Sequence, residues 1–135
     1  MSRFIISRTE VGVSFLLRSD TDRFLAESKP YATLDACKKA IGSMVNCLAT
    51  APLTDRAVGE DAPNPKIEIC EKRHEVWYTF KASNGKSVLI QGPYATRKAA
   101  LRAIAMLRAA MQKASVWMET SKGVIPLTFK ASNEK

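Results

Sequence analysis

Residues 76–86 read VWYTFKASNGK, and this stretch decides the fold. Val76, Tyr78 and Phe80 occupy every second position, which is the period of a half-buried β-strand. The Asn-Gly pair that follows favours a tight turn into a second strand at Ser87–Gln91. The stretch therefore predicts a β-hairpin with Val76, Tyr78 and Phe80 facing the core.

Two parts of the chain repeat each other at an offset of 63 residues. Pro30-Tyr31-Ala32-Thr33 recurs as Pro93-Tyr94-Ala95-Thr96, and the same offset pairs Phe15 with Tyr78 and Ile41 with Ile104. A shorter echo repeats Phe80–Asn84 as Phe129–Asn133. The sequence thus predicts one domain, 1–135, made of internal repeat one (3–48), a linker (49–65), internal repeat two (66–113) and a partial third repeat (115–133).

Each unit is expected to run strand, strand, strand, helix. The first strands are expected at Phe4–Ser7 and Ile67–Cys70, echoed by Val116–Glu119. The second strand of the first unit faces the core with Val13, Phe15 and Leu17. The third unit would do so with Ile125, Leu127 and Phe129, while Pro126 takes the outward position, as an edge strand permits.

The helices are expected to begin after Thr33 and Thr96, which stand as N-caps before helical patterns. Their core stripes are Cys37, Ile41, Met44 and Leu48, and, 63 residues later, Ala100, Ile104, Leu107 and Met111. Residues 49–65 have no period and contain Pro and Gly, which is typical of a linker.

These residues resemble the YegP-like domain of unknown function. The second unit has its hairpin motif, Phe80-Lys81-Ala82-Ser83-Asn84-Gly85, followed by Val88, Ile90, Tyr94 and Ile104 at the family's spacing. The first unit keeps Leu17, Tyr31 and Ile41 but has Asp20-Thr21-Asp22-Arg23 in place of Asn-Gly, so its turn must differ. The resemblance covers about residues 3–48 and 66–113. It implies no established activity, cofactor or catalytic residue.

The fold class expected from the periodicity and the resemblance is α+β. Two tandem β-β-β-α units share one antiparallel sheet with the helices packed on one face, and a partial third unit adds two strands. The resemblance also implies that the C-terminal strands are exchanged between the units. Residues 116–130 could complete this chain's sheet or that of a neighbour.

The composition excludes several classes of protein. The chain has 135 residues, three Cys without a C-x-x-C pair and one His, His74, so neither a metal site nor a catalytic centre is expected. No apolar run is long enough for a membrane span, and a reduced, cytoplasmic protein without cofactor or small-molecule substrate is the expectation. The net charge of +8 lies wholly in residues 66–135, which hold 13 Lys and Arg against 5 Asp and Glu.

The strand alternation places both tryptophans, Trp77 and Trp117, on the outward phase, and large aromatic side chains there suggest a contact surface. We expect them on one open sheet face with Ile5, Leu16 and Lys81. The candidate partner-binding residues are Trp77, Trp117, Thr79, Lys81, Lys86, Arg97, Lys98 and Arg102. The chain is accordingly interpreted as a small non-enzymatic module that binds a protein or forms a homodimer. The alternative is a single-stranded nucleic-acid-binding protein, with the tryptophans stacking on bases and the cations neutralising phosphates.

Overall fold

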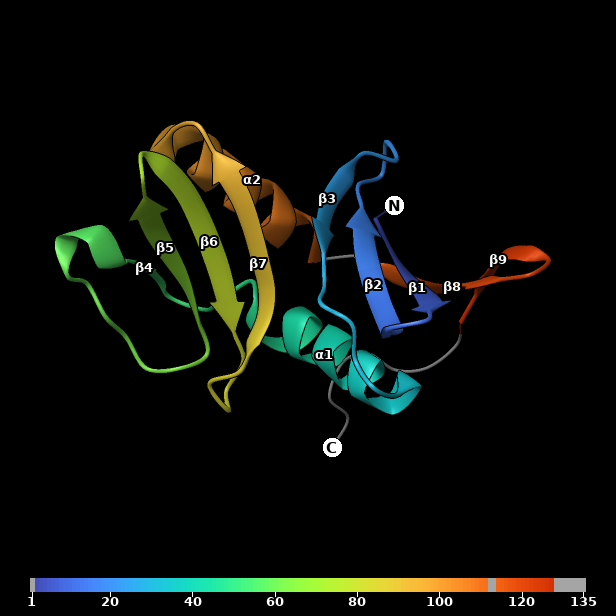
Figure 1. Ribbon diagram of the computed structural model, residues 1–135. Helices are drawn as coiled ribbons and strands as arrows, with labels where there is room; N and C mark the ends of the chain where they lie inside the picture. The colour runs from blue at the N-terminus through green and yellow to red at the C-terminus, as the bar shows by residue number, and fades with distance from the viewer. Residues whose placement is uncertain (1, 112–113, 128–135) are drawn as a thin grey trace.

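A computed structural model describes residues 2–111 and 114–127 (Figure 1). Its first half contains strands β1 (Arg3–Thr9), β2 (Gly12–Arg18) and β3 (Phe24–Glu27), helix α1 (Leu34–Cys47), strand β4 (Leu53–Asp55) and the short 3-10 helix η1 (Arg56–Val58). Its second half contains strands β5 (Lys66–Lys72), β6 (Glu75–Lys81) and β7 (Ser87–Tyr94), helix α2 (Arg97–Ala110), and strands β8 (Ser115–Thr120) and β9 (Gly123–Pro126). The expected α+β class is confirmed, whereas the internal repeat stays a prediction of the sequence.

The strands form two sheets, so the expectation of one antiparallel sheet is wrong. The five-stranded sheet has the order β3-β2-β1-β8-β9 and the four-stranded sheet the order β4-β5-β6-β7. Each sheet is mixed, because β8 pairs parallel with β1 and β4 pairs parallel with β5. Each helix connects the two sheets: α1 leads from β3 of the five-stranded sheet to β4 of the four-stranded sheet, and α2 leads from β7 back to β8. The strand after each helix therefore pairs with the other half of the chain, as the resemblance implies.

The two sheets meet along a seam, the line where the edge strands β3 and β7 face each other (Figure 1). Only one bridge, Ser28–Leu89, joins these strands among the described residues. Nearby, Gln91 Nε2 donates to the Glu27 carbonyl at 2.9 Å. Further along β7, Pro93 has no N–H to donate, and the pairing with β6 shifts register between Val76 and Tyr78. The seam is therefore closed at its Ser28 end and open at its Phe24 end.

One hydrophobic cluster joins both sheets and both helices. The expected inward residues of β2 and β6 are buried in it, as are the core stripes of the two helices. Thr33 Oγ1 accepts from the Ala36 amide and Thr96 Oγ1 from the Ala99 amide, both at 3.1 Å, which confirms the two N-caps. These local expectations hold because they follow from side-chain periodicity within single elements.

The expected inward position of Ile125 is wrong, because its side chain is 47% exposed. β9 is an edge strand, and Figure 1 shows the β8–β9 hairpin extending away from the helices, so no layer covers it. Pro126 lies in this edge strand as expected, and Leu127 is half-buried. Phe129 lies outside the described residues. Through β8, residues 115–127 complete this chain's own sheet.

The linker contains structure that its composition did not indicate. Leu53–Asp55 forms β4 beside β5, and η1 follows it. A strand of three residues is too short to show a period in the sequence, which explains the omission. No helix within residues 2–111 and 114–127 is long and apolar enough to cross a membrane.

Candidate functional site

The expected platform of two tryptophans on one face is wrong. Trp77 lies on β6 in the four-stranded sheet, and Trp117 lies on β8 in the five-stranded sheet. The two strands separate because β8, after α2, crosses to pair with β1. Ile5 and Leu16 share a cross-strand row with Trp117, whereas Lys81 lies on the same strand as Trp77.

Trp77 is half-buried on the outward face of β6, with Thr79 and Lys81 further along the strand. Its ring packs over Gly92 of β7, where an added methyl group would lie 2.8 Å from the ring. A surface hollow of about 500 Å³ lies beside Trp77, Cys70 and Arg73. The outward position is thus correct, but part of the ring is used for packing within the chain.

Trp117 is also half-buried and has partners of its own. Its indole Nε1 donates to Ser115 Oγ at 2.9 Å. The Arg3 guanidinium lies 5.1 Å from the ring centroid, within the range of a cation–π interaction. Neighbouring chain groups therefore cover both the polar atom and one face of the ring.

The basic candidates differ in how free they are to meet an anion. Arg97 binds Asp55 through Nε at 2.6 Å and through a second nitrogen at 2.9 Å, and binds Glu71 at 2.7 Å. These contacts raise the pKa of Arg97 and tie the start of α2 to β4 and β5. Lys98, Arg102 and Lys86 are exposed.

The basic helix and the Trp77 side chain lie on opposite sides of the four-stranded sheet. α2 contacts β6 and β7, and its stripe of Ile104 and Leu107 joins the core with Tyr78. Trp77 points the other way, because successive side chains of a strand face opposite sides. Lys98 and Arg102 therefore cannot act on one surface with Trp77.

A buried carboxylate organises the outward face of β5. Glu68 is 4% exposed, and its oxygens lie 3.0 Å from Lys66 Nζ and 3.2 Å from Lys81 Nζ. Burial alone raises the pKa of this carboxyl, but the two lysines outweigh it and hold the pKa below its ordinary value. Lys66 also binds Asp61 at 2.7 Å, so the segment after β4 covers the cluster. Lys81 is a candidate phosphate ligand in the sequence, but in the structure it is paired with Glu68.

The described residues include no group of three or more His, Cys, Asp or Glu side chains that could hold a metal ion. His74 is exposed and lies in the turn between β5 and β6. Both turn residues, Arg73 and His74, have positive φ values, 54° and 69°, as a two-residue hairpin turn with two left-handed residues requires. The position of His74 thus has a structural explanation.

A groove along the seam is the surface that sequence reasoning missed. One hollow of about 340 Å³ lies on the helix side, against Leu25, Tyr94, Ala103 and Met106. A second hollow of about 410 Å³ involves Ser28, Lys29, Ser87 and Ile90 and no residue of α2. Both hollows share Phe24, Gln91 and Gly92. We call the two hollows together the seam groove.

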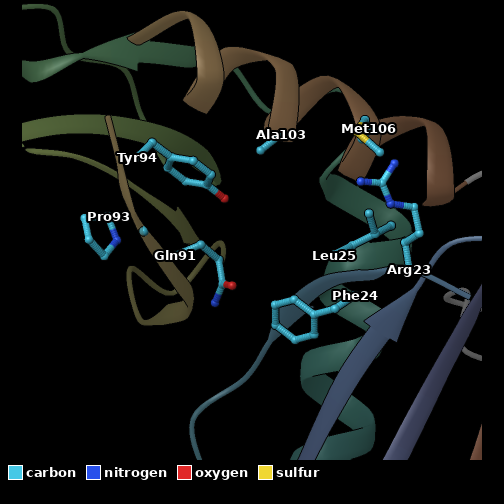
Figure 2. Close-up of a pocket in the computed structure, with 9 residues that line it drawn as sticks. Arg23, Phe24, Leu25, Gln91, Pro93, Tyr94, Ala103 and Met106 are labelled. Carbon is cyan, nitrogen blue, oxygen red and sulfur yellow. The ribbon is translucent and has the colours of Figure 1, made fainter. Parts of the chain in front are cut away.

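Apolar side chains are unusually open in the seam groove. Phe24 is 53%, Ile90 58% and Met106 40% exposed. Figure 2 shows the Phe24 ring pointing toward Gln91 across the seam, while the Arg23 side chain points toward Met106. Clustered exposed apolar groups of this kind mark contact sites more often than isolated ones do.

Tyr94 lines the helix-side hollow and stacks on the buried Tyr78 behind it. The Tyr78 and Tyr94 rings lie 6.1 Å apart at an interplanar angle of 14°. Tyr78 is fully buried, and its hydroxyl has no hydrogen-bond partner within the described part of the chain. Burial raises the pKa of both phenols, so they are neutral at physiological pH. The tyrosine pair thus contributes no charge to the wall that Arg23 shares.

The sequence carried a weak signal for this groove. Phe24 and Ile90 are apolar in strands that the pattern placed near turns, but they stand 66 positions apart. Only the pairing of β3 with β2 and of β7 with β6 brings their free edges together.

Comparisons with known proteins agree on the fold. The solution NMR structure of yegP from E. coli, a protein of unknown function, superposes with a TM-score of 0.71 over 89% of this chain and 94% of that one. This chain has the YegP fold. The solution NMR structure of a UPF0339 protein from Shewanella oneidensis has a TM-score of 0.70 over 87% of this chain and 90% of that one.

The sequences behind the YegP fold have diverged widely. The identity is 17% with the E. coli protein and 12% with the Shewanella oneidensis protein. No protein-family model matches the chain, and neither does any curated protein. The likeness therefore shows the fold alone, and the function has to be argued from the surface of this chain.

Proposed function

We propose that this chain is a non-enzymatic protein-binding module that takes an extended segment of a partner protein into the seam groove. The single observation that carries the proposal is the apolar groove bounded by two free strand edges. Within residues 2–111 and 114–127, β3 is paired only with β2, and β7 only with β6, apart from the Ser28–Leu89 bridge. Free strand edges beside apolar hollows are the usual setting for the addition of a peptide strand.

The seam groove also has the anchors that such binding needs. Phe24, Ile90 and Met106 offer apolar surface that the chain itself leaves open. Residues 24–26 of β3 lie on the open side of the hydrogen bond from Gln91 to the Glu27 carbonyl, so about 10 Å of extended chain fits along the strand. A cytoplasmic location belongs to the same proposal and is supported by three free cysteines.

A peptide library tests the proposal directly. Random octapeptides displayed on phage are selected on the full chain, and the enriched peptides are measured against Phe24→Ser. We expect about tenfold weaker binding to this variant, because an exposed aromatic anchor is lost. The matched control is Val11→Ser, since Val11 is 76% exposed but lies in the β1–β2 turn. Lack of enrichment, or equal binding to all three proteins, overturns the proposal.

Self-association through the groove is tested by a second measurement. A homodimer that forms at micromolar concentration and dissociates on Phe24→Ser would make a second copy the occupant. Sedimentation of the unmodified chain and of the variant distinguishes this outcome from capture of a partner peptide.

Binding of single-stranded nucleic acid is the second candidate function, and one observation favours it, the exposed cations of α2. Lys98 and Arg102 lie on the exposed face of α2, which has no acidic residue between Arg97 and Ala110. Against it stand the separation of the two tryptophans and the engagement of Lys81 and Arg97 with carboxylates. The protein-binding proposal needs none of these residues and is therefore preferred.

A further inference from the structure

We propose that the segment bound in the seam groove is acidic, with a carboxylate that meets Arg23 and an adjacent large apolar side chain that packs on Phe24 and Ile90. This inference rests on the proposed function, since it names the chemistry of the same site. Two observations support it: the charges of the residues that line the groove, and the presence of one hollow on each side of the seam.

Arg23 is the cation best placed to select a ligand. Its side chain lines the helix-side hollow and points toward Met106 (Figure 2). No carboxylate within residues 2–111 and 114–127 forms an ion pair with it. The nearest acid in sequence, Asp22, is taken by Arg3 at 3.4 Å and Arg18 at 3.8 Å. An anionic partner group is therefore missing at the open end of the groove.

A second cation lines the groove. Lys29 lines the other hollow, with its Nζ 5.9 Å from the centroid of the Tyr31 ring. Glu27 is the one acidic residue among those that line the two hollows. The groove is thus cationic, and an acidic segment complements it.

The shape of the seam sets the order of residues in the segment. Successive side chains of an extended strand point to opposite sides. A strand lying along the seam would present alternate residues to the helix-side hollow with Arg23 and to the outer hollow with Ile90. In an acidic residue followed by a large apolar residue, the carboxylate would meet Arg23 in the helix-side hollow and the apolar side chain would meet Ile90 in the outer hollow.

Gln91 limits how far along the seam the bound segment can extend. Its amide donates to the Glu27 carbonyl at 2.9 Å and to the Ile90 carbonyl at 2.8 Å, across the middle of the seam. The Glu27 carbonyl on the outer edge of β3 therefore already accepts a hydrogen bond from within the chain. The segment is expected to enter from the Phe24 end and to stop at Gln91.

Three labelled hexapeptides test the inference by fluorescence polarisation with the full chain. They alternate leucine with glutamate, with glutamine or with lysine. We expect the glutamate peptide to bind roughly three- to tenfold more tightly than the glutamine peptide, with a difference that shrinks in high salt. Arg23→Glu should remove this preference and favour the lysine peptide. The matched control is Arg8→Glu, which changes the net charge equally on an exposed β1 residue outside the groove.

The outcomes separate this inference from the proposed function. Equal binding of all three peptides, with loss on Phe24→Ser, overturns the acidic preference but leaves a peptide-binding groove. An equal effect of Arg8→Glu and Arg23→Glu also overturns it, because overall charge rather than a site would then attract the peptide. Absence of binding by the glutamate peptide overturns the inference, whereas the proposed function is decided by enrichment from the octapeptide library and loss of binding on Phe24→Ser.

Discussion

The guanidinium of Arg108, near the end of α2, donates to the backbone carbonyl of Leu48, the C-cap residue of α1, at 2.9 Å. It also donates to the carbonyls of Ala49 and Ala51, both at 2.9 Å. The last turn of α1 has no basic residue of its own. A side chain from the second half of the chain therefore satisfies the carbonyl end of the helix in the first half.

Arg108→Met should destabilise the protein by about 1 to 3 kcal/mol, because charged hydrogen bonds to three carbonyls are lost. Urea unfolding followed by circular dichroism measures the change. Arg102→Met on the exposed face of the same helix is the control and should stay within about 0.5 kcal/mol of the unmodified chain. Equal stability of the two variants would contradict the role assigned to Arg108.

Gly92→Ala should be more damaging than Gly123→Ala, because only the added methyl group at Gly92 meets neighbouring atoms. Gly92 has φ 145°, and an added methyl group would lie 2.8 Å from the Trp77 ring and 3.0 Å from the Val76 carbonyl. Gly123→Ala is the matched control, because Gly123 also has positive φ, 112°, but has no atom within 4 Å of that position. We expect Gly92→Ala to lower the unfolding free energy by about 2 kcal/mol more than Gly123→Ala does. A similar cost for both would mean that the Trp77 ring moves freely aside.

Glu68 makes stability depend on pH in the acidic range. Its pKa is lower in the folded chain than the ordinary value, so its contribution is present above the ordinary pKa and is lost as pH falls through the lowered one. Glu68→Gln should cost about 1 to 2 kcal/mol at pH 7, and the difference should shrink between about pH 5 and pH 3. Urea titrations at several pH values measure it, with exposed Glu75→Gln as control. A difference that is constant with pH would contradict the assignment.

The three cysteines should differ in reactivity. Cys37 is fully buried, and burial raises the pKa of its thiol to about 11, whereas Cys47 and Cys70 are half-buried. Because the thiolate is the reactive form, Cys37 should react with Ellman's reagent at pH 8 only after the chain unfolds. In Cys37→Ser, the reaction that appears only on unfolding should be lost, and the reaction of Cys47 and Cys70 should be unchanged. Rapid reaction of all three thiols in the native protein would show that the α1 face opens in solution.

The tryptophans report on the nucleic-acid alternative. With single-stranded DNA at low and moderate salt, we expect the intrinsic fluorescence to stay unchanged, because the indole of Trp117 is held by Ser115 and Arg3 and the ring of Trp77 by Gly92. Quenching that weakens steeply with salt would instead place bases on these rings. Trp77→Phe and Trp117→Phe then identify which ring the bases contact.

The sequence predicted local structure wherever apolar side chains recur at the period of a single strand or helix. The alternation of Val76, Tyr78 and Phe80 predicted a buried strand face, and Thr33 and Thr96 predicted the starts of both helices. These predictions succeed because side-chain direction repeats every two residues in a strand and about every 3.6 in a helix, whatever lies beyond. Ile125 was mispredicted because the same alternation cannot tell whether another layer covers the strand.

The sequence by itself determined the buried faces of β2 and β6, the helix faces, the caps and the charge of the second half, but not the short strand β4. The tertiary structure alone decided which strands share a sheet, and thereby parted Trp77 from Trp117 and brought Phe24 close to Ile90. The physical reason is that an outward-facing side chain has the same local pattern in any sheet. Its neighbours are chosen by hydrogen bonds between strands far apart in the chain, such as β8 beside β1, and by the helices that carry the chain across.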